Sequence, residues 1–193
     1  MFVEFQPDQV GLKEVGREAG VSHALITHYF GTYAGMVEAV LERRIRAVRE
    51  AMLGRLSETG ALARPAELLA ELFRALEDPV HVRLTRWMLA SERPSAAHAL
   101  ALRHHGLKLI AHQVAAALDP QPTDATIATI EMALLAVVSA AYGYAIGKYA
   151  LAGALGRQVS GELDREVHHT LAAMLETHLR TMLALRAPHP ISR

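Results

Sequence analysis

Hydrophobic residues recur at helical spacing along nearly the whole chain. Leu12, Val15 and Ala19 share one face of a short helix, and Ile26 and Phe30 share one face of a second. Longer helices are predicted over residues 33–55, 66–76, 96–118, 124–155 and 161–186, and another starts at Asp78-Pro79. No stretch alternates apolar and polar residues as a half-buried strand does, so the pattern predicts an all-α fold.

A tight turn at Gly20 joins the two short helices. Glycine favours the positive φ that such a reversal needs, and the Ser22 hydroxyl can cap the second helix by accepting a backbone N–H. Val21 is predicted to pack the turn onto the core, whereas Gly16 is expected to cost up to ~1 kcal/mol inside the first helix. A helix-turn-helix of this shape places its second helix in the major groove of DNA.

The turn lies within a distinctive set of residues: Ala19-Gly20-Val21-Ser22, Ile26, Tyr29-Phe30-Gly31 and a helix with apolar periodicity from Tyr33. Over residues 11–45 the chain resembles bacterial regulators of the tetracycline-repressor (TetR) family. The resemblance implies a helix-turn-helix head over residues 1–50 and an antiparallel helical bundle for ligand binding and dimerisation over residues 51–193. It also implies a repressor that binds palindromic double-stranded operator DNA as a homodimer and is released by a small-molecule effector.

The chain departs from the family pattern at three places. Such repressors have a complete first helix and a basic arm ahead of Gly11, whereas residues 1–5 suffice for only the last turn of that helix. We therefore expect either an upstream start or a truncated head. Gly16 stands where the family has alanine, and Tyr33-Ala34 replaces Lys-Glu, so Tyr33 offers a phosphate a hydrogen bond but no charge.

The second helix supplies most of the predicted DNA contacts. The predicted DNA-binding residues are Ser22, His23, Ala24, Leu25, Thr27, His28, Tyr29, Thr32 and Tyr33. Within this set His23, Leu25, Thr27 and His28 are expected nearest the base edges. Ser22, Tyr29 and Tyr33 are expected to hold phosphates.

The charge of the head argues against tight DNA binding. Residues 1–30 contain two bases, Lys13 and Arg17, against four acids, Glu4, Asp8, Glu14 and Glu18, a net charge of −2. Because DNA affinity depends on neutralising phosphates, this head is expected to bind weakly by itself. The alternative is a helical ligand-binding dimer that has lost DNA binding.

The cluster Arg43-Arg44-Arg46-Arg49 is predicted to be a solvated helix face.

The resemblance to TetR-family repressors implies a dimer interface made by the last two long helices of each chain. Small residues recur at spacings of three and four along the first of them, and such a stripe allows another helix to approach closely. The predicted interface comprises Ala136, Ala140, Gly143, Gly147 and Ala150, with Met174, Leu175 and Met182 from the last helix. Packing within one chain is the alternative, and two-fold symmetry with a palindromic operator favours the dimer.

The resemblance implies a ligand pocket in the helical body, and the large side chains there are the predicted ligand-binding residues: Phe73, Trp87, Met88, Met132, Tyr142 and Tyr144. Apolar walls with a few polar groups are typical of small-molecule pockets. Each residue taken singly is also a plausible core residue, and none of them identifies the effector.

Other chemistry finds little support in the sequence. The chain has no cysteine, its first ten residues lack the pattern of a signal peptide, and residues 132–147 are predicted to be a buried helix too short to span a membrane. His98, His105 and His112 recur every seven residues. Successive members would lie ~10.5 Å apart along a helix axis, which is too far for them to share a metal ion. We expect a cytoplasmic protein without metal or cofactor that is not an enzyme.

Overall fold

The structure, a computed structural model, describes residues 2–58, 60, 65–90 and 105–184. These residues form one 3₁₀-helix and eight α-helices, and contain no strand, so the predicted all-α fold is confirmed. The helices are η1 (Pro7–Gln9), α1 (Leu12–Ala19), α2 (His23–Phe30), α3 (Tyr33–Leu56), α4 (Pro65–Leu76), α5 (Pro79–Ala90), α7 (His105–Leu118), α8 (Asp124–Ala154) and α9 (Gly161–Ala184).

The predicted helix boundaries agree with these within one or two residues wherever both ends are described. Residues 96–104 of the predicted helix over 96–118 lie outside the described residues, and so does His98. Proline at the start of α4 and α5 suits the first turn of a helix, where its missing N–H would have no intrahelical partner.

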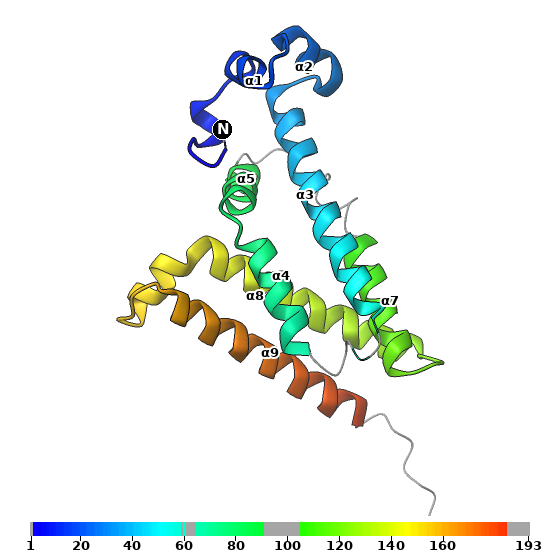
Figure 1. The fold of residues 1–193 in the computed structure, drawn as a ribbon. Coiled ribbons are helices and arrows are strands. Elements are labelled where there is room, and N and C mark those ends of the chain that lie inside the picture. Colours follow the sequence, from blue (N-terminus) through cyan, green and yellow to red (C-terminus); the bar gives the residue numbers. More distant parts are fainter. Residues whose placement is uncertain (1, 59, 61–64, 91–104, 185–193) are drawn as a thin grey trace, which may run out of the picture.

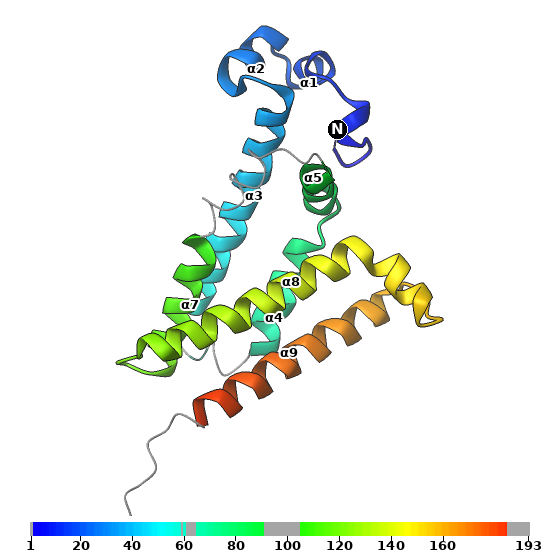
Figure 2. The ribbon, with the colours of Figure 1, turned by 180° about the vertical axis from the view of Figure 1, so that it is seen from behind.

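The long helix α3 connects the two ends of the molecule. Figure 1 shows α1 and α2 at one end of α3, with α5 beside it, while α8 and α9 lie side by side across the other end, as they also do from behind in Figure 2. Helix α4 packs against α3, α8 and α9, and α7 packs against α3 and α8. One continuous helix therefore runs from the head into the bundle.

Three apolar clusters hold these helices together. The cluster nearest the head joins α2 to α3 and α5 through Ile26, Met36, Val37, Leu41, Leu84 and Met88. The second joins α3, α4, α7 and α8, with Met52, Leu56 and Ile130 among its members. The third joins α4 to α8 and α9 around Phe73, which is 1% exposed. Helix α5 therefore shares its core with the head.

Helix α8 has the length that the sequence predicts, but it is more exposed. It has 31 residues, and its most apolar 18-residue window has a mean hydropathy of 1.7. By length and composition the helix could cross a membrane, but core helices of water-soluble proteins meet the same criterion. Only 33% of that window is buried. The prediction of a buried helix over residues 132–147 is therefore wrong, because one side of α8 packs on α7 and α9 while the other carries exposed small and apolar side chains.

Candidate nucleic-acid interface and ligand cavity

The turn between α1 and α2 is held by contacts within a few residues. Gly20 is left-handed at φ 69°, and the Ser22 Oγ accepts the Leu25 backbone N–H at 3.2 Å. Gly16 is buried beneath the turn, where a Cβ would lie 2.7 Å from the Val21 carbonyl oxygen. Glycine at position 16 is therefore required by the close approach of the turn, rather than being only a weak point of α1.

Helix α2 directs almost all of its side chains away from the body. Ile26 is its one buried residue and is 5% exposed, packing in the cluster with α3 and α5. Tyr29 is 73% exposed, and its ring meets the edge of the His28 ring at 5.3 Å. The predicted contact residues Ser22, His23, Ala24, Leu25, Thr27, His28, Tyr29 and Thr32 are all exposed. The face of α2 opposite Ile26 is accessible to a partner.

Two side chains of the head that were predicted to pack inward are exposed. Val21 is 38% exposed and Phe30 is 42% exposed. Backbone hydrogen bonds such as that from Val21 N–H to the Gly16 carbonyl oxygen (2.9 Å) hold the turn instead. The prediction that these side chains pack inward is wrong, because the body covers only the Ile26 side of α2.

Tyr33 is not placed as predicted for a phosphate contact. Its hydroxyl donates to the Pro7 carbonyl oxygen at 2.7 Å, and its ring meets the Trp87 ring edge-on at 5.9 Å. Burial, reinforced by the Asp8 carboxylate, raises the pKa of Tyr33 to about 12. The hydroxyl proton is thus used within the protein, where it joins α3 to the segment ahead of α1.

Residues 2–5 form turns rather than the last helical turn expected over residues 1–5, and η1 follows them. The Arg83 guanidinium donates to the carbonyl oxygens of Phe2 (2.5 Å) and Phe5 (3.3 Å). The Trp87 indole N–H donates to an Asp8 carboxylate oxygen at 2.5 Å. The amino-terminal segment is therefore fastened to one face of α5.

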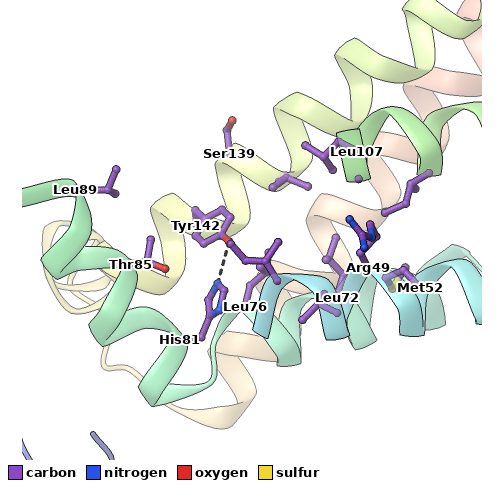
Figure 3. Close-up of a pocket in the computed structure, with 15 residues that line it drawn as sticks. Arg49, Met52, Leu72, Leu76, His81, Thr85, Leu89, Leu107, Ser139 and Tyr142 are labelled. Carbon is purple, nitrogen blue, oxygen red and sulfur yellow. Dashed lines mark hydrogen bonds between the residues drawn. The ribbon is translucent and has the colours of Figure 1, made fainter. Parts of the chain in front are cut away.

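A cavity of about 320 Å³ lies between α3, α4, α5, α7 and α8. Its lining residues, drawn in Figure 3, are Ile45, Val48, Arg49, Met52, Leu72, Leu76, His81, Thr85, Leu89, Gly106, Leu107, Ile110, Val138, Ser139 and Tyr142. Most of these side chains are apolar, and a few polar groups stand among them. Apolar walls with few polar groups are the usual composition of a small-molecule site.

Two polar atoms in the cavity wall are buried and have no hydrogen-bond partner among the described residues: His81 Nδ1 and Thr85 Oγ1. The other ring nitrogen of His81, Nε2, is 2.9 Å from the Tyr142 hydroxyl. Burial, reinforced by the Arg44 guanidinium and opposed by Asp78, lowers the pKa of His81 to about 4. Burial raises the pKa of Tyr142 to about 12. Both groups are therefore neutral near pH 7.

Two arginines of α3 depart from the predicted solvated face. Arg44 forms an ion pair with Asp78, whose carboxylate also accepts the backbone N–H groups of Val80 and His81 at 3.0 Å each. Arg44 thus holds the first turn of α5 against α3. Arg49 lines the cavity, and its side chain packs over Gly106, where a Cβ would lie 2.8 Å from the Arg49 Cδ. The prediction holds for Arg43 and Arg46, which are exposed.

The six residues predicted to bind a ligand are not brought together. Tyr142 lines the cavity, whereas Phe73 and Met88 belong to separate apolar clusters. Trp87 faces the amino-terminal segment, and Met132 is 59% exposed on α8. The Tyr144 hydroxyl donates to Asp164 at 2.8 Å on α9. The size and polarity of a side chain did not distinguish residues that line the cavity from residues that fill the core, because large side chains suit both places.

The small-residue stripe of α8 faces outward. Ala136, Ala140, Gly143 and Ala150 are exposed, and Gly147 is half-buried. On α9, Met174 is 62% exposed, and Leu175 and Met182 are half-buried. A groove of about 400 Å³ runs between the two helices, lined by Met132, Ala133, Ala136, Val137, Ala140, Leu171, Met174, Leu175 and His178.

This arrangement has a counterpart among solved structures. The chain matches a structure described as a tetR-family transcriptional regulator from Streptomyces coelicolor, with a TM-score of 0.58 over 95% of this chain and 83% of that one. The chain has a TetR-type fold. The two sequences are 21% identical, so the likeness concerns the fold. No protein-family model and no curated protein sequence matches the chain.

The cavity in this TetR-type fold is lined by residues that the sequence did not single out. His81, Thr85 and Leu89 recur every four residues on α5, a spacing that puts them on one helix face. That spacing was visible in the sequence, but nothing indicated which helices the face meets. Among the described residues no group of three or more His, Cys, Asp or Glu side chains is placed to hold a metal ion.

Proposed function

We propose that the chain is a ligand-responsive transcriptional repressor that binds a palindromic operator as a homodimer and is released by a small molecule. In this proposal residues 1–50 bind DNA, residues 51–193 bind the ligand and the second subunit, and the protein acts in the cytoplasm without catalysing a reaction. The likeness to a transcriptional regulator in fold supports the general class.

The observation that carries the proposal is the position of α3. Its first residue follows the Thr32 cap directly after α2, and its later turns supply Ile45, Val48, Arg49 and Met52 to the cavity wall. A ligand that changes the position of these side chains moves the helix that carries the head. Ligand binding and DNA binding are then coupled as two states of one rigid element.

The exposed face of α2 is the proposed DNA contact. Thr27 and His28 can hydrogen-bond base edges in the major groove, while Ser22 and Tyr29 can reach phosphates. The Thr27 hydroxyl donates to the His23 carbonyl oxygen at 3.0 Å and still has acceptor capacity. Two heads in a dimer would contact half-sites ~34–36 Å apart.

The exposed stripe on α8 and its neighbour α9 are the proposed dimer interface. Ala140→Glu places a charge in the groove and is expected to convert the dimer to monomer in analytical ultracentrifugation, because a close helix pair leaves no room for it. The matched control is Ala116→Glu, at an exposed position of α7. Equal dimerisation of both variants would contradict this interface.

The direct test is a salt titration of binding to the DNA upstream of the chain's own gene, with a scrambled duplex as competitor. Selective binding that weakens steeply with salt is expected of a repressor that regulates its own gene. Equal binding to both duplexes would reject autoregulation through this site.

The second candidate is a ligand-binding dimer that does not bind DNA. The observation that favours it is the charge of the head, where residues 1–30 carry four acids and two bases and α2 has no lysine or arginine. Ligand binding by the cavity with no selective DNA binding at any salt concentration would establish this second function instead.

A further inference from the structure

The polar groups of the cavity lie mainly on two sides, and the remaining one, Ser139, is at an exposed position of α8. Figure 3 shows His81, Thr85 and Tyr142 on one side and Arg49 with Met52 on the other. Leucine, isoleucine and valine side chains from all five helices make up most of the remaining wall, and Leu76 lies between the two sides in Figure 3. A molecule that fills the cavity therefore meets a neutral hydrogen-bonding end, an apolar middle and a cationic end.

Two buried polar atoms of the neutral end have no described hydrogen-bond partner, although His81 Nε2 is bonded to the Tyr142 hydroxyl. His81 is 1% exposed and Thr85 is 5% exposed, and His81 Nδ1 and Thr85 Oγ1 have no partner among the described residues. A buried polar atom without a partner is costly, so a ligand oxygen that pairs with either of them removes a cost already present in the empty protein. A hydroxyl or keto oxygen suits this end, because Thr85 can both donate and accept.

The cationic end holds an arginine whose charge is poorly matched. The Arg49 guanidinium has Glu50 at 3.9 Å, a weak ion pair with a carboxylate whose side chain is 65% exposed. No aspartate or glutamate occurs among the described lining residues, and the other titratable groups that line the cavity are His81 and Tyr142. Arg44 and Asp78, which face His81 from α3 and the start of α5, pair with each other. An anionic group is favoured at Arg49 and an amine is disfavoured.

We propose that this cavity binds a carboxylic acid with its carboxylate at Arg49, an aliphatic body between the helices, and a hydroxyl or keto oxygen at Thr85 and His81. At ~30 Å³ for each water-sized group, a volume of about 320 Å³ accommodates roughly ten non-hydrogen atoms. A medium-chain hydroxy acid or keto acid has this size and polarity. The inference rests on the proposed function, because this acid is the effector of the repressor.

The test is isothermal titration calorimetry of the full chain with four probes of one chain length: octanoate, 8-hydroxyoctanoate, octan-1-ol and octylamine. The hydroxy acid is expected to bind most tightly, then octanoate, then the alcohol, with the amine weakest. Arg49→Gln should weaken octanoate binding more than ~10-fold, since hydrogen bonds to charged groups are the strong ones, and should leave octan-1-ol binding within ~2-fold.

Three further variants separate binding from folding. Arg49→Lys keeps a cation and is expected to retain octanoate binding within ~10-fold. Thr85→Val should remove the advantage of 8-hydroxyoctanoate over octanoate without changing octanoate binding. Arg46→Gln, on an exposed position of the same helix, is the matched control and should bind all four probes as the unaltered chain does.

The inference is overturned if octylamine binds as tightly as octanoate, if Arg49→Gln binds octanoate unchanged, or if no probe binds. Selective DNA binding with no binding of either acid would reject this ligand class and leave the repressor proposal standing. Arg49-dependent binding of the acids with no selective DNA binding would support the ligand class and reject the repressor.

Discussion

The caps of α2 and α3 in the head are made by residues near them in the chain, whereas two polar atoms in the cavity have no partner among the described residues. Ser22 caps α2 through Leu25 N–H, and Thr32 caps α3 through Gly35 N–H at 3.0 Å. In the cavity, His81 and Thr85 come from one helix and face side chains of four others. The caps of α2 and α3 are therefore satisfied within the protein, whereas His81 Nδ1 and Thr85 Oγ1 are buried without a described partner.

This difference assigns separate physical roles to the two regions. The turn that presents α2 is held by hydrogen bonds between residues close in the chain, and Ile26 is the one buried side chain of α2. The cavity carries buried polar groups that cost free energy until a ligand pairs with them. Helix α5 joins the two regions, because His81 and Thr85 face the cavity while Arg83 and Trp87 hold the amino-terminal segment.

The largest expected effect lies in the head. Replacing Thr27 and His28 together by alanine should lower selective operator binding by ~2–6 kcal/mol, since each good base contact contributes ~1–3 kcal/mol. Fluorescence anisotropy with labelled operator DNA measures this change. Both side chains are exposed, so dimerisation and the thermal midpoint should remain those of the unaltered chain. Loss of the dimer would mean that these side chains are structural.

The pH dependence of stability should come from the cavity. The pKa of His81 falls from 6.5 to about 4 on folding, so between these values the unfolded chain binds a proton that the folded chain excludes. The free energy of unfolding should therefore decrease as the pH falls from about 6.5 towards 4, by about 3 kcal/mol in total.

Urea denaturation of His81→Gln across this pH range checks the assignment. The variant should lose most of that decrease, while His28→Gln, at an exposed position of the head, should keep it. If the free energy of unfolding depends on pH in the same way in the unaltered chain and in His81→Gln, a group other than His81 causes the decrease.

The close approach beneath the head turn predicts an unusual response to alanine. Gly16→Ala should lower the free energy of unfolding by ~1–3 kcal/mol, because its Cβ would meet the Val21 carbonyl oxygen at 2.7 Å. Gly54→Ala on α3, where a Cβ meets nothing within 4 Å, should instead stabilise the protein by ~0.5–1 kcal/mol. Chemical denaturation of both variants compares them, and stabilisation by Gly16→Ala would contradict the packing of the turn.

The smallest expected effect tests the unpaired hydroxyl in the cavity. Thr85→Val should stabilise the ligand-free chain by about 1 kcal/mol, because it removes a buried oxygen without a described partner. Thr129→Val on α8 is the control, since the Thr129 hydroxyl donates to the Ala125 carbonyl oxygen at 2.9 Å. Thermal denaturation should show a higher midpoint for the first variant only. A lower midpoint for Thr85→Val would show that its hydroxyl is paired.

The sequence by itself determined the all-helical fold, the extent of α1 from Leu12 to Ala19, the left-handed Gly20 and the Ser22 cap. These features depend on residues within about one helical turn of each other, so periodicity and capping preferences suffice to predict them. The small residues along α8 were also evident, and they do lie on its exposed side.

Only the tertiary structure decided which helix faces meet. Periodicity shows that a face is apolar but not which helix packs against it, so nothing in the sequence joined His81 of α5 to Tyr142 of α8, 61 positions away. The same limit hid the bond from Tyr33 to Pro7, the ion pair from Arg44 to Asp78, and the place of Arg49 in the cavity wall. Contacts between residues far apart in the chain depend on how all the helices pack together. The spacing of residues within one helix does not show this packing.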